Sequence, residues 1–129
     1  MNKKNNCIHE KIGLHIIGDF YRCNLSAFSG KSKTKTIQKL SPMIKKSGLH
    51  ELGYYYHKFN DGGFTVVFAL TESHLSIHTW PESKYVSLDI FVCNYSKDNS
   101  QNAISLYNKI KAIFNPQKVS KKTIKRRLT

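Results

Sequence analysis

Two neighbouring stretches of the sequence alternate between apolar and polar side chains. They read SHLSIHTW over residues 73–80 and YVSLDIFVC over residues 85–93. Because successive side chains of a β-strand point to opposite faces, this period of two predicts two strands, each with an aliphatic face and a polar face. The intervening PESK is short enough for a hairpin. The aliphatic face has to be covered, so the chain is constrained to a sheet packed against another layer.

Three more segments have the composition of strands. The segments ELGYYYHKF (residues 51–59) and FTVVFALT (residues 64–71) flank NDGG, which is a strong turn sequence, so they predict a further hairpin. The segment IGLHIIGDFY, residues 12–21, predicts a first strand, with glycines as possible bends. The expected sheet therefore contains five strands, all in a pattern that suits antiparallel pairing.

Apolar residues at helical spacing predict two helices. The first lies within residues 34–47, where Pro42 predicts that the helix begins or kinks near Ser41. The second runs from about Ser100 to Phe114 and stops before an Asn-Pro pair. Together these elements predict an α+β fold with one domain over residues 1–129: a two-layer α/β sandwich in which both helices cover the aliphatic face of an antiparallel sheet.

The uncovered sheet face concentrates residues that carry chemistry. It would hold His74, His78 and Trp80 from one strand and Cys93 from the next. For a single histidine, contact with water is the commoner explanation. A tryptophan, two histidines and a cysteine together weaken that explanation, because solvent faces rarely concentrate such residues without use. We therefore expect the functional site on this face.

The formal net charge of +13 comes largely from two segments. Residues 31–46 and 118–127 each contain six basic residues and no acid, so we interpret them as a connecting region and as part of a basic tail over residues 117–129. A basic tail gives salt-sensitive affinity for nucleic acid or other polyanions, which makes polyanion binding one hypothesis. The sequence contains no RNA-binding aromatic motif, zinc finger or KH-like GxxG to support specific recognition.

Cysteine spacing and hydropathy narrow the class of protein further. Cys7, Cys23 and Cys93 form neither a CxxC pair nor a Cys/His ligand pattern, so we expect free thiols without a disulfide framework or a zinc site. No apolar run approaches the length of about 18 residues that a membrane span needs, and no signal-peptide core follows the first residues. A cytoplasmic protein is expected.

The polar strand carries a recognisable motif. The segment ESHLSIHTWPE followed by SLDIFVC closely resembles the processing and active-site region of the small, bacterial-type S-adenosylmethionine decarboxylase proenzymes. The segment GLHIIGDFYRC resembles the first strand of that family, and SGLHELGYYYHKF resembles its second. The resemblance covers about residues 12–127, which is nearly the whole chain.

This resemblance implies that the chain makes its own prosthetic group. Cleavage at Glu72-Ser73 would convert Ser73 into a pyruvoyl group and separate a β chain of residues 1–72 from an α chain of residues 73–129. His78 is the implied acceptor for the Ser73 α-proton, since a neutral imidazole accepts protons near cytoplasmic pH. No exogenous cofactor and no metal is expected.

The resemblance also implies the reaction. A pyruvoyl ketone forms a Schiff base with S-adenosylmethionine and accepts the electrons released with carbon dioxide. The product would be an aminopropyl donor for spermidine synthesis. Cys93 is the implied proton donor, because a thiol is largely protonated at neutral pH. Phe59 would stack on adenine and Glu82 would bind the ribose hydroxyls, while Thr65, where the family has a serine, would help to order His78.

Family members form dimers in which the sheets of two protomers face each other and each site draws residues from both. We therefore expect a homodimer of αβ units. His74 belongs to the motif but receives no role from it. One departure lies next to the site, because Asn94 follows Cys93 where the family usually has glycine.

Two alternatives stay open from the sequence. A pyruvoyl-dependent ornithine or arginine decarboxylase would use the same chemistry, but such small substrates need neither Phe59 nor Glu82. A non-catalytic polyanion-binding homologue would use the basic tail instead. The presence of Ser73, His78 and Cys93 together argues against that second alternative.

Overall fold

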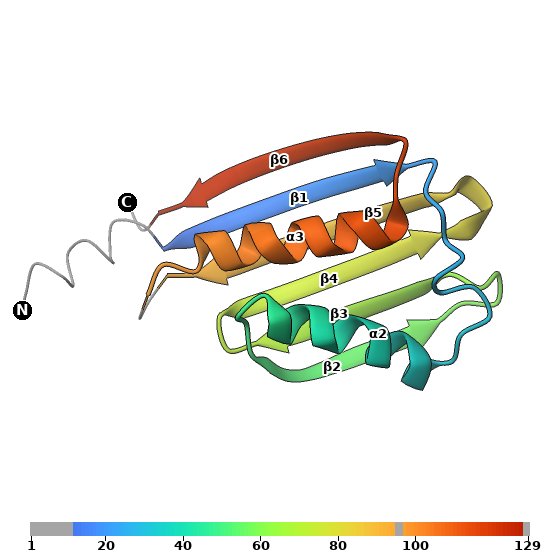
Figure 1. Cartoon of the computed structure of the whole chain (residues 1–129), viewed down its shortest axis with the longest axis horizontal. Coiled ribbons are helices and arrows are strands. Elements are labelled where there is room, and N and C mark those ends of the chain that lie inside the picture. The colour runs from blue at the N-terminus through green and yellow to red at the C-terminus, as the bar shows by residue number, and fades with distance from the viewer. Residues whose placement is uncertain (1–11, 95–96, 128–129) are drawn as a thin grey trace, which may run out of the picture.

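The computed structural model describes residues 12–94 and 97–127 and shows two layers, a sheet and a pair of helices (Figure 1). The six-stranded sheet has the order β2-β3-β4-β5-β1-β6, and every neighbouring pair is antiparallel. The strands are β1 (Gly13–Tyr21), β2 (Glu51–Lys58), β3 (Phe64–Leu70), β4 (Ser73–Trp80), β5 (Tyr85–Cys93) and β6 (Lys118–Arg126). The helices are α2 (Lys33–Lys46), α3 (Ser100–Phe114) and the short 3-10 turn η1 (Pro81–Ser83). In the part of the chain described, no helix combines the length and the apolar character that a membrane crossing requires.

Both predicted hairpins are present. In the first, Gly62 has a φ of +92°, which suits a glycine, and the Phe59 N–H donates to the Gly63 carbonyl at 2.8 Å to close the turn between β2 and β3. In the second, β4 and β5 pair from Ser73 opposite Val92 to Trp80 opposite Tyr85, with η1 as the connection.

The aliphatic sheet face forms the core, as the alternation predicts. Both helices lie on this face (Figure 1). The fully buried side chains come from the sheet and from both helices, and the largest include Phe20, Phe68, Phe114, Ile16, Leu40, Ile44, Leu75, Ile77, Leu88, Ile90, Leu106 and Ile110. Burial of one such side chain stabilises a fold by roughly 1.5–3 kcal/mol. The prediction of an α+β sandwich with helices on one face is therefore confirmed.

Helix α2 corrects one expectation, because it runs through Pro42 as a single element. The helix begins at Lys33, where the Ser32 hydroxyl accepts a hydrogen bond from the Lys35 N–H at 3.2 Å. Proline removes one N–H of the ladder, while the buried side chains of Leu40 before it and Ile44 after it hold the helix on both sides. The predicted start of the helix near Ser41 is wrong, because the helix begins at Lys33.

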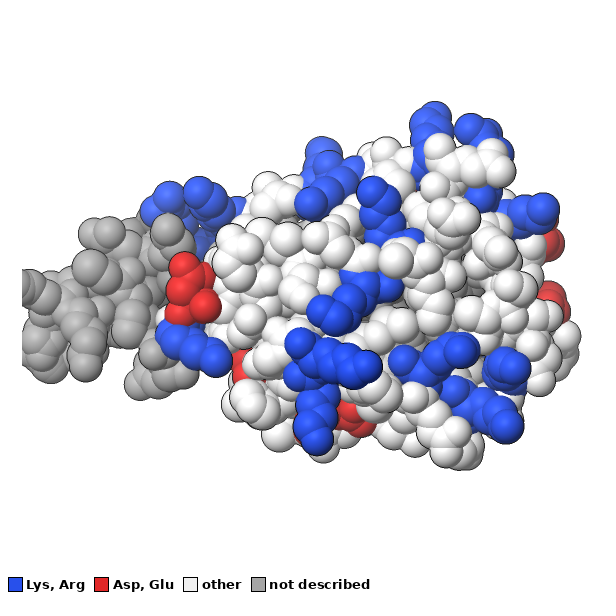
Figure 2. Space-filling model, in the orientation of Figure 1, with Lys and Arg blue, Asp and Glu red and all other residues white. Residues whose placement is uncertain are grey.

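The segment interpreted as a basic tail is the edge strand β6. It pairs with β1 along its whole length, from Tyr21 opposite Lys118 to Gly13 opposite Arg126. Lysines on an edge strand discourage pairing with further chains, which gives part of this charge a structural use. On the helix-covered face, basic side chains are spread out rather than gathered in one groove (Figure 2).

Candidate active site

The predicted functional residues lie at two separate places along β4. We call the first the Ser73 end, defined by Glu72, Ser73 and Cys93, where β4 begins and β5 ends. We call the second the His78 end, defined by Thr65 and His78, near the opposite end of β4. Each end has its own hydrogen-bond geometry, and the two differ in what they are able to do.

At the Ser73 end, the backbone is strained at the bond expected to be cut. Ser73 has a φ of +150°, a conformation that residues with a side chain rarely adopt. The Cys93 N–H donates to the Glu72 carbonyl oxygen at 2.6 Å. The carbonyl that Ser73 would attack is thus already polarised by a fixed backbone donor.

The side chain of Glu72 anchors the other side of this bond. It is buried, and its carboxylate accepts hydrogen bonds from the His50 N–H at 3.1 Å and from His50 Nδ1 at 2.6 Å. Burial alone raises the pKa of this carboxyl, but the hydrogen bonds from His50 outweigh burial and bring the pKa below its ordinary value of 4.5. Glu72 is therefore held as a carboxylate, and residue 72 is fixed in place.

At the His78 end, the contact expected of Thr65 is present. Thr65 Oγ1 lies 2.8 Å from His78 Nδ1 across the β3–β4 pair. The His78 ring also packs against Trp80, with ring centres 6.1 Å apart, and Trp80 stacks on Tyr85 at 5.0 Å. A hydroxyl and an aromatic wall therefore limit the rotation of the imidazole.

The two residues expected to bind the substrate lie beyond the same end. Phe59 follows β2 in the turn that leads to β3. The residue is 48% exposed, and the His57 ring packs against its ring with centres 4.7 Å apart. Glu82 is an exposed residue of η1, just after Trp80. Both side chains are accessible to a ligand on this part of the surface.

One chain does not bring Ser73 and His78 together. They are five residues apart on the continuous strand β4, and a strand rises about 3.3 Å per residue, so roughly 16 Å separates them. The structure groups Ser73 with Cys93, and His78 with Thr65, at opposite ends of β4. The cleavage residue and its expected proton acceptor therefore lie apart within one chain.

The cysteines differ in environment. Cys23 and Cys93 are both free thiols, as expected. Burial raises the pKa of Cys23 to about 11, despite a backbone hydrogen bond with Val86 that lowers it, so this thiol is inert at neutral pH. Cys93 is only partly buried and lies at the end of the polar face. Cys7 is outside the described residues.

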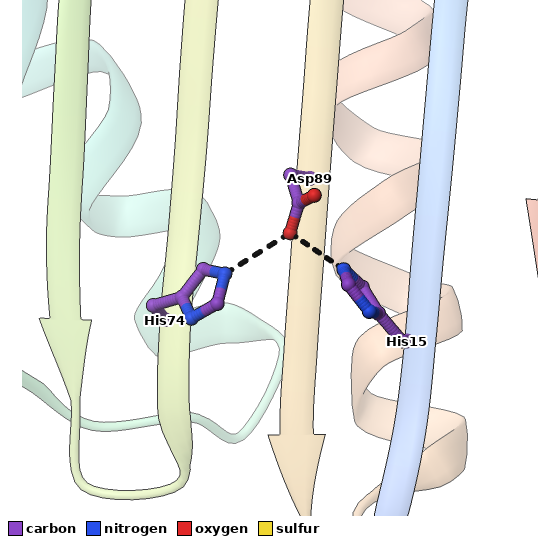
Figure 3. A group of neighbouring side chains, drawn as sticks. All are labelled: His15, His74 and Asp89. Carbon is purple, nitrogen blue, oxygen red and sulfur yellow. Dashed lines mark hydrogen bonds and ion pairs between the residues drawn. The ribbon is translucent and has the colours of Figure 1, made fainter. Parts of the chain in front are cut away.

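Sequence reasoning missed His15 and His50 as members of the polar network. His15 Nε2 and His74 Nε2 both lie against Asp89 Oδ1, at 2.8 and 3.0 Å, beside the Ser73 end (Figure 3). Strand period alone places His15 on the polar face, but its neighbour Asp89 depends on β1 pairing with β5, which local sequence does not predict.

Comparison with known proteins gives this arrangement a family. The solved adenosylmethionine decarboxylase of Aquifex aeolicus matches the structure with a TM-score of 0.79 and 27% identity, over 93% of this chain and 94% of that one. The fold is thus the two-layer α+β sandwich of a decarboxylase. The family model of S-adenosylmethionine decarboxylase matches residues 14–127. The chain belongs to the S-adenosylmethionine decarboxylase family.

Curated relatives agree with this assignment. The S-adenosylmethionine decarboxylase proenzyme of Persephonella marina is 30% identical over 92% of this chain and 85% of its own length. The proenzyme of Sulfurihydrogenibium sp. is 36% identical over 67% of this chain and 63% of its own length. The chain thus spans a little under two thirds of that second relative.

Proposed function

We propose that this protein is a self-processing, pyruvoyl-dependent decarboxylase of S-adenosylmethionine that works in the cytoplasm as a homodimer. The observation that carries the proposal is the strained Glu72-Ser73 bond, whose carbonyl already accepts a backbone hydrogen bond. Membership of a family whose relatives are named proenzymes supports self-cleavage at this bond. The product would supply aminopropyl groups for spermidine synthesis.

Cleavage follows from the geometry of the Ser73 end. Ser73 Oγ attacks the Glu72 carbonyl carbon, and the Cys93 N–H at 2.6 Å stabilises the negative charge that develops on the carbonyl oxygen. The C–N bond breaks, the amide becomes an ester, and the strain at residue 73 is released. His78 then removes the Ser73 α-proton, and the bond between Ser73 Cβ and Oγ breaks. This elimination leaves dehydroalanine at residue 73 and releases the main-chain carboxylate of Glu72. Hydrolysis with loss of ammonia leaves the pyruvoyl group on the α chain.

A second copy of the chain completes the site. Because about 16 Å separates Ser73 from His78 along β4, two copies must lie with their polar faces together and their strands reversed. The Ser73 end of one copy then meets the His78 end of the other. The same face carries exposed apolar side chains at Tyr55 and Trp80, 69% and 40% exposed, which a partner would cover.

Within that paired site the remaining residues have distinct tasks. The pyruvoyl group supplies an imine-forming ketone and an electron sink. Cys93, partly buried at the end of β5, would return a proton to the substrate α-carbon. Phe59 would stack on adenine and Glu82 would hold the ribose hydroxyls, since both side chains are exposed. An ornithine or arginine substrate would leave both residues unused, and that alternative is not favoured.

A complementation experiment tests cleavage and pairing together. Ser73→Ala and His78→Ala chains, each expected to stay uncut or to cut slowly alone, are co-expressed with tags of different mass. In mixed dimers, the His78→Ala chain keeps Ser73 and receives His78 from its partner. We expect that chain alone to be cut, as measured by intact mass under denaturing conditions, with the wild-type chain as positive control.

Each result is informative. A wild-type chain that stays whole refutes the proposed function. A wild-type chain that is cut, together with a mixed sample that stays whole, refutes the shared site and leaves the cleavage chemistry standing. Release of carbon dioxide from S-adenosylmethionine, with ornithine and arginine in parallel, then identifies the substrate.

A further inference from the structure

The polar face holds a cluster of side chains that the chemistry above does not use. His15 on β1, His74 on β4 and Asp89 on β5 converge on one carboxylate oxygen (Figure 3). Their ligand atoms all lie within 4.8 Å of one another, a spacing that also suits a metal ion. Which ring nitrogens carry protons decides whether this cluster is a metal site or a network of hydrogen bonds.

Arg126 determines where His15 carries its proton. Arg126 Nη1 lies 3.2 Å from His15 Nδ1, and the guanidinium also lies 5.2 Å from the centre of the Phe91 ring. A guanidinium only donates hydrogen bonds, so His15 Nδ1 holds the lone pair and Nε2 holds the proton. That proton points to Asp89, which leaves Nε2 of His15 unable to bind a metal. The cluster is therefore a hydrogen-bonded chain.

The same reasoning applies to His74. An ionised carboxylate only accepts hydrogen bonds, so His74 Nε2, 3.0 Å from Asp89 Oδ1, also carries a proton. In the described part of the chain, no group is hydrogen-bonded to His74 Nδ1. The His74 side chain is 41% exposed, so this nitrogen is an open acceptor on the residue that follows Ser73.

We propose that Arg126 is a positioning residue for the cleavage site. Acting through His15 and Asp89, it holds the His74 ring in one orientation, with Nε2 against Asp89 Oδ1. The C-terminal edge strand β6 thus reaches the cleavage site through three other strands.

The link to cleavage rests on the proposed function. His74 is the residue after Ser73 on β4, and its ring is held to Asp89 on the neighbouring strand β5 at 3.0 Å. This contact fixes the β4 backbone beside the Glu72-Ser73 bond while Ser73 Oγ attacks the Glu72 carbonyl carbon.

Ring-nitrogen NMR on the uncut Ser73→Ala protein tests this hydrogen-bond network, and the measurement does not depend on cleavage or decarboxylation. Long-range proton–nitrogen spectra of histidine distinguish a proton on Nε2 from one on Nδ1. We expect both His15 and His74 in the Nε2–H form. Adding Arg126→Leu should change the His15 signals, whereas Lys122→Leu should leave them as they are, because Lys122 lies four residues away on the same face of β6.

The cleavage rate of the chain that keeps Ser73 is the second measurement. We expect Arg126→Leu to slow cleavage about fivefold or more, the factor that the loss of one typical hydrogen bond produces. Arg126→Gln keeps an N–H donor and should recover most of the rate, and Lys122→Leu should match the parent.

Two results would overturn the inference. One is an Nδ1–H form of either histidine while Arg126 is intact, or spectra that Arg126→Leu leaves unchanged. The other is an Arg126→Leu chain that cuts as fast as Lys122→Leu. A parent chain that never cuts refutes the proposed function instead, and the NMR result still decides the tautomers independently.

Discussion

Gly13 offers a direct test of how tightly β1 and β5 are joined beside the cleavage site. A Cβ at this position would lie 1.9 Å from the Val92 carbonyl oxygen and 3.1 Å from the Cys93 Cα, both of them backbone atoms. An ordinary contact needs at least 3.4 Å, so Gly13→Ala forces the two strands about 1.5 Å apart. A hydrogen bond stretched by that amount is lost.

The expected cost combines two terms. Overpacking of a close contact costs about 1–3 kcal/mol, and the loss of one ladder hydrogen bond costs about 1 kcal/mol more. We therefore expect Gly13→Ala to lower the free energy of unfolding by about 2–4 kcal/mol, which corresponds to a Tm lower by roughly 8–16 °C for a chain of this size. The Cys93 N–H would move with its strand, so cleavage should slow as well.

Urea unfolding of the uncut Ser73→Ala chain, followed by circular dichroism at one fixed protein concentration, measures this difference. Gly53→Ala is the matched control, because a Cβ at Gly53 meets nothing within 4 Å and Gly53 also lies in a strand. The control should be neutral or slightly stabilising. If Gly13→Ala unfolds within about 0.5 kcal/mol of its parent, or no earlier than Gly53→Ala, the argument from close approach is refuted.

Three further predictions concern single contacts. His50→Ala should destabilise the uncut chain by about 1–3 kcal/mol at pH 7. The pKa of Glu72 in the folded chain lies below 4.5, so this difference is present above pH 4.5 and should vanish in unfolding curves as the pH falls through the folded value; a constant difference would contradict it. Thr65→Val should slow cleavage while Thr65→Ser does not, since only serine keeps the hydroxyl beside His78; equal rates by intact mass would refute that role. Peptide mass mapping after alkylation at pH 8 should find Cys23 unmodified in the folded protein and modified in urea, and modification under both conditions would count against its burial.

The local pattern of apolar and polar residues was sufficient to predict a strand or helix where one face of that element is aliphatic. Strands β4 and β5 follow from alternation, and the neighbouring positions of Thr65 and His78 follow once β3 and β4 form adjacent strands. Strand β6 escaped prediction for the opposite reason. Its helix-facing positions include Lys121, whose charged group lies 4.6 Å over the Tyr107 ring, so a long polar side chain covers the apolar surface that an aliphatic residue would otherwise cover.

The candidate site was predictable only in part, because some of its contacts join residues close in the sequence and others join residues far apart in it. The motif named Ser73, His78 and Cys93, but their distribution over the two ends of β4 emerges only from the length of that strand. The contacts of Asp89 with His15 depend on β1 lying between β5 and β6, a pairing of strands far apart in the chain. Such pairings are decided by the packing of the whole sheet rather than by any local pattern.

The order of strands in the sheet affects how the protein would refold after a cut between residues 72 and 73. The N-terminal fragment would contain β1, β2 and β3, and the C-terminal fragment would contain β4, β5 and β6. Strand β1 would therefore stay between β5 and β6 of the other fragment. Folding of the intact chain is a first-order process, but refolding of the cut protein would require two molecules to meet and would depend on concentration. Maturation would thus turn a reversible fold into one that dilution after denaturation does not restore.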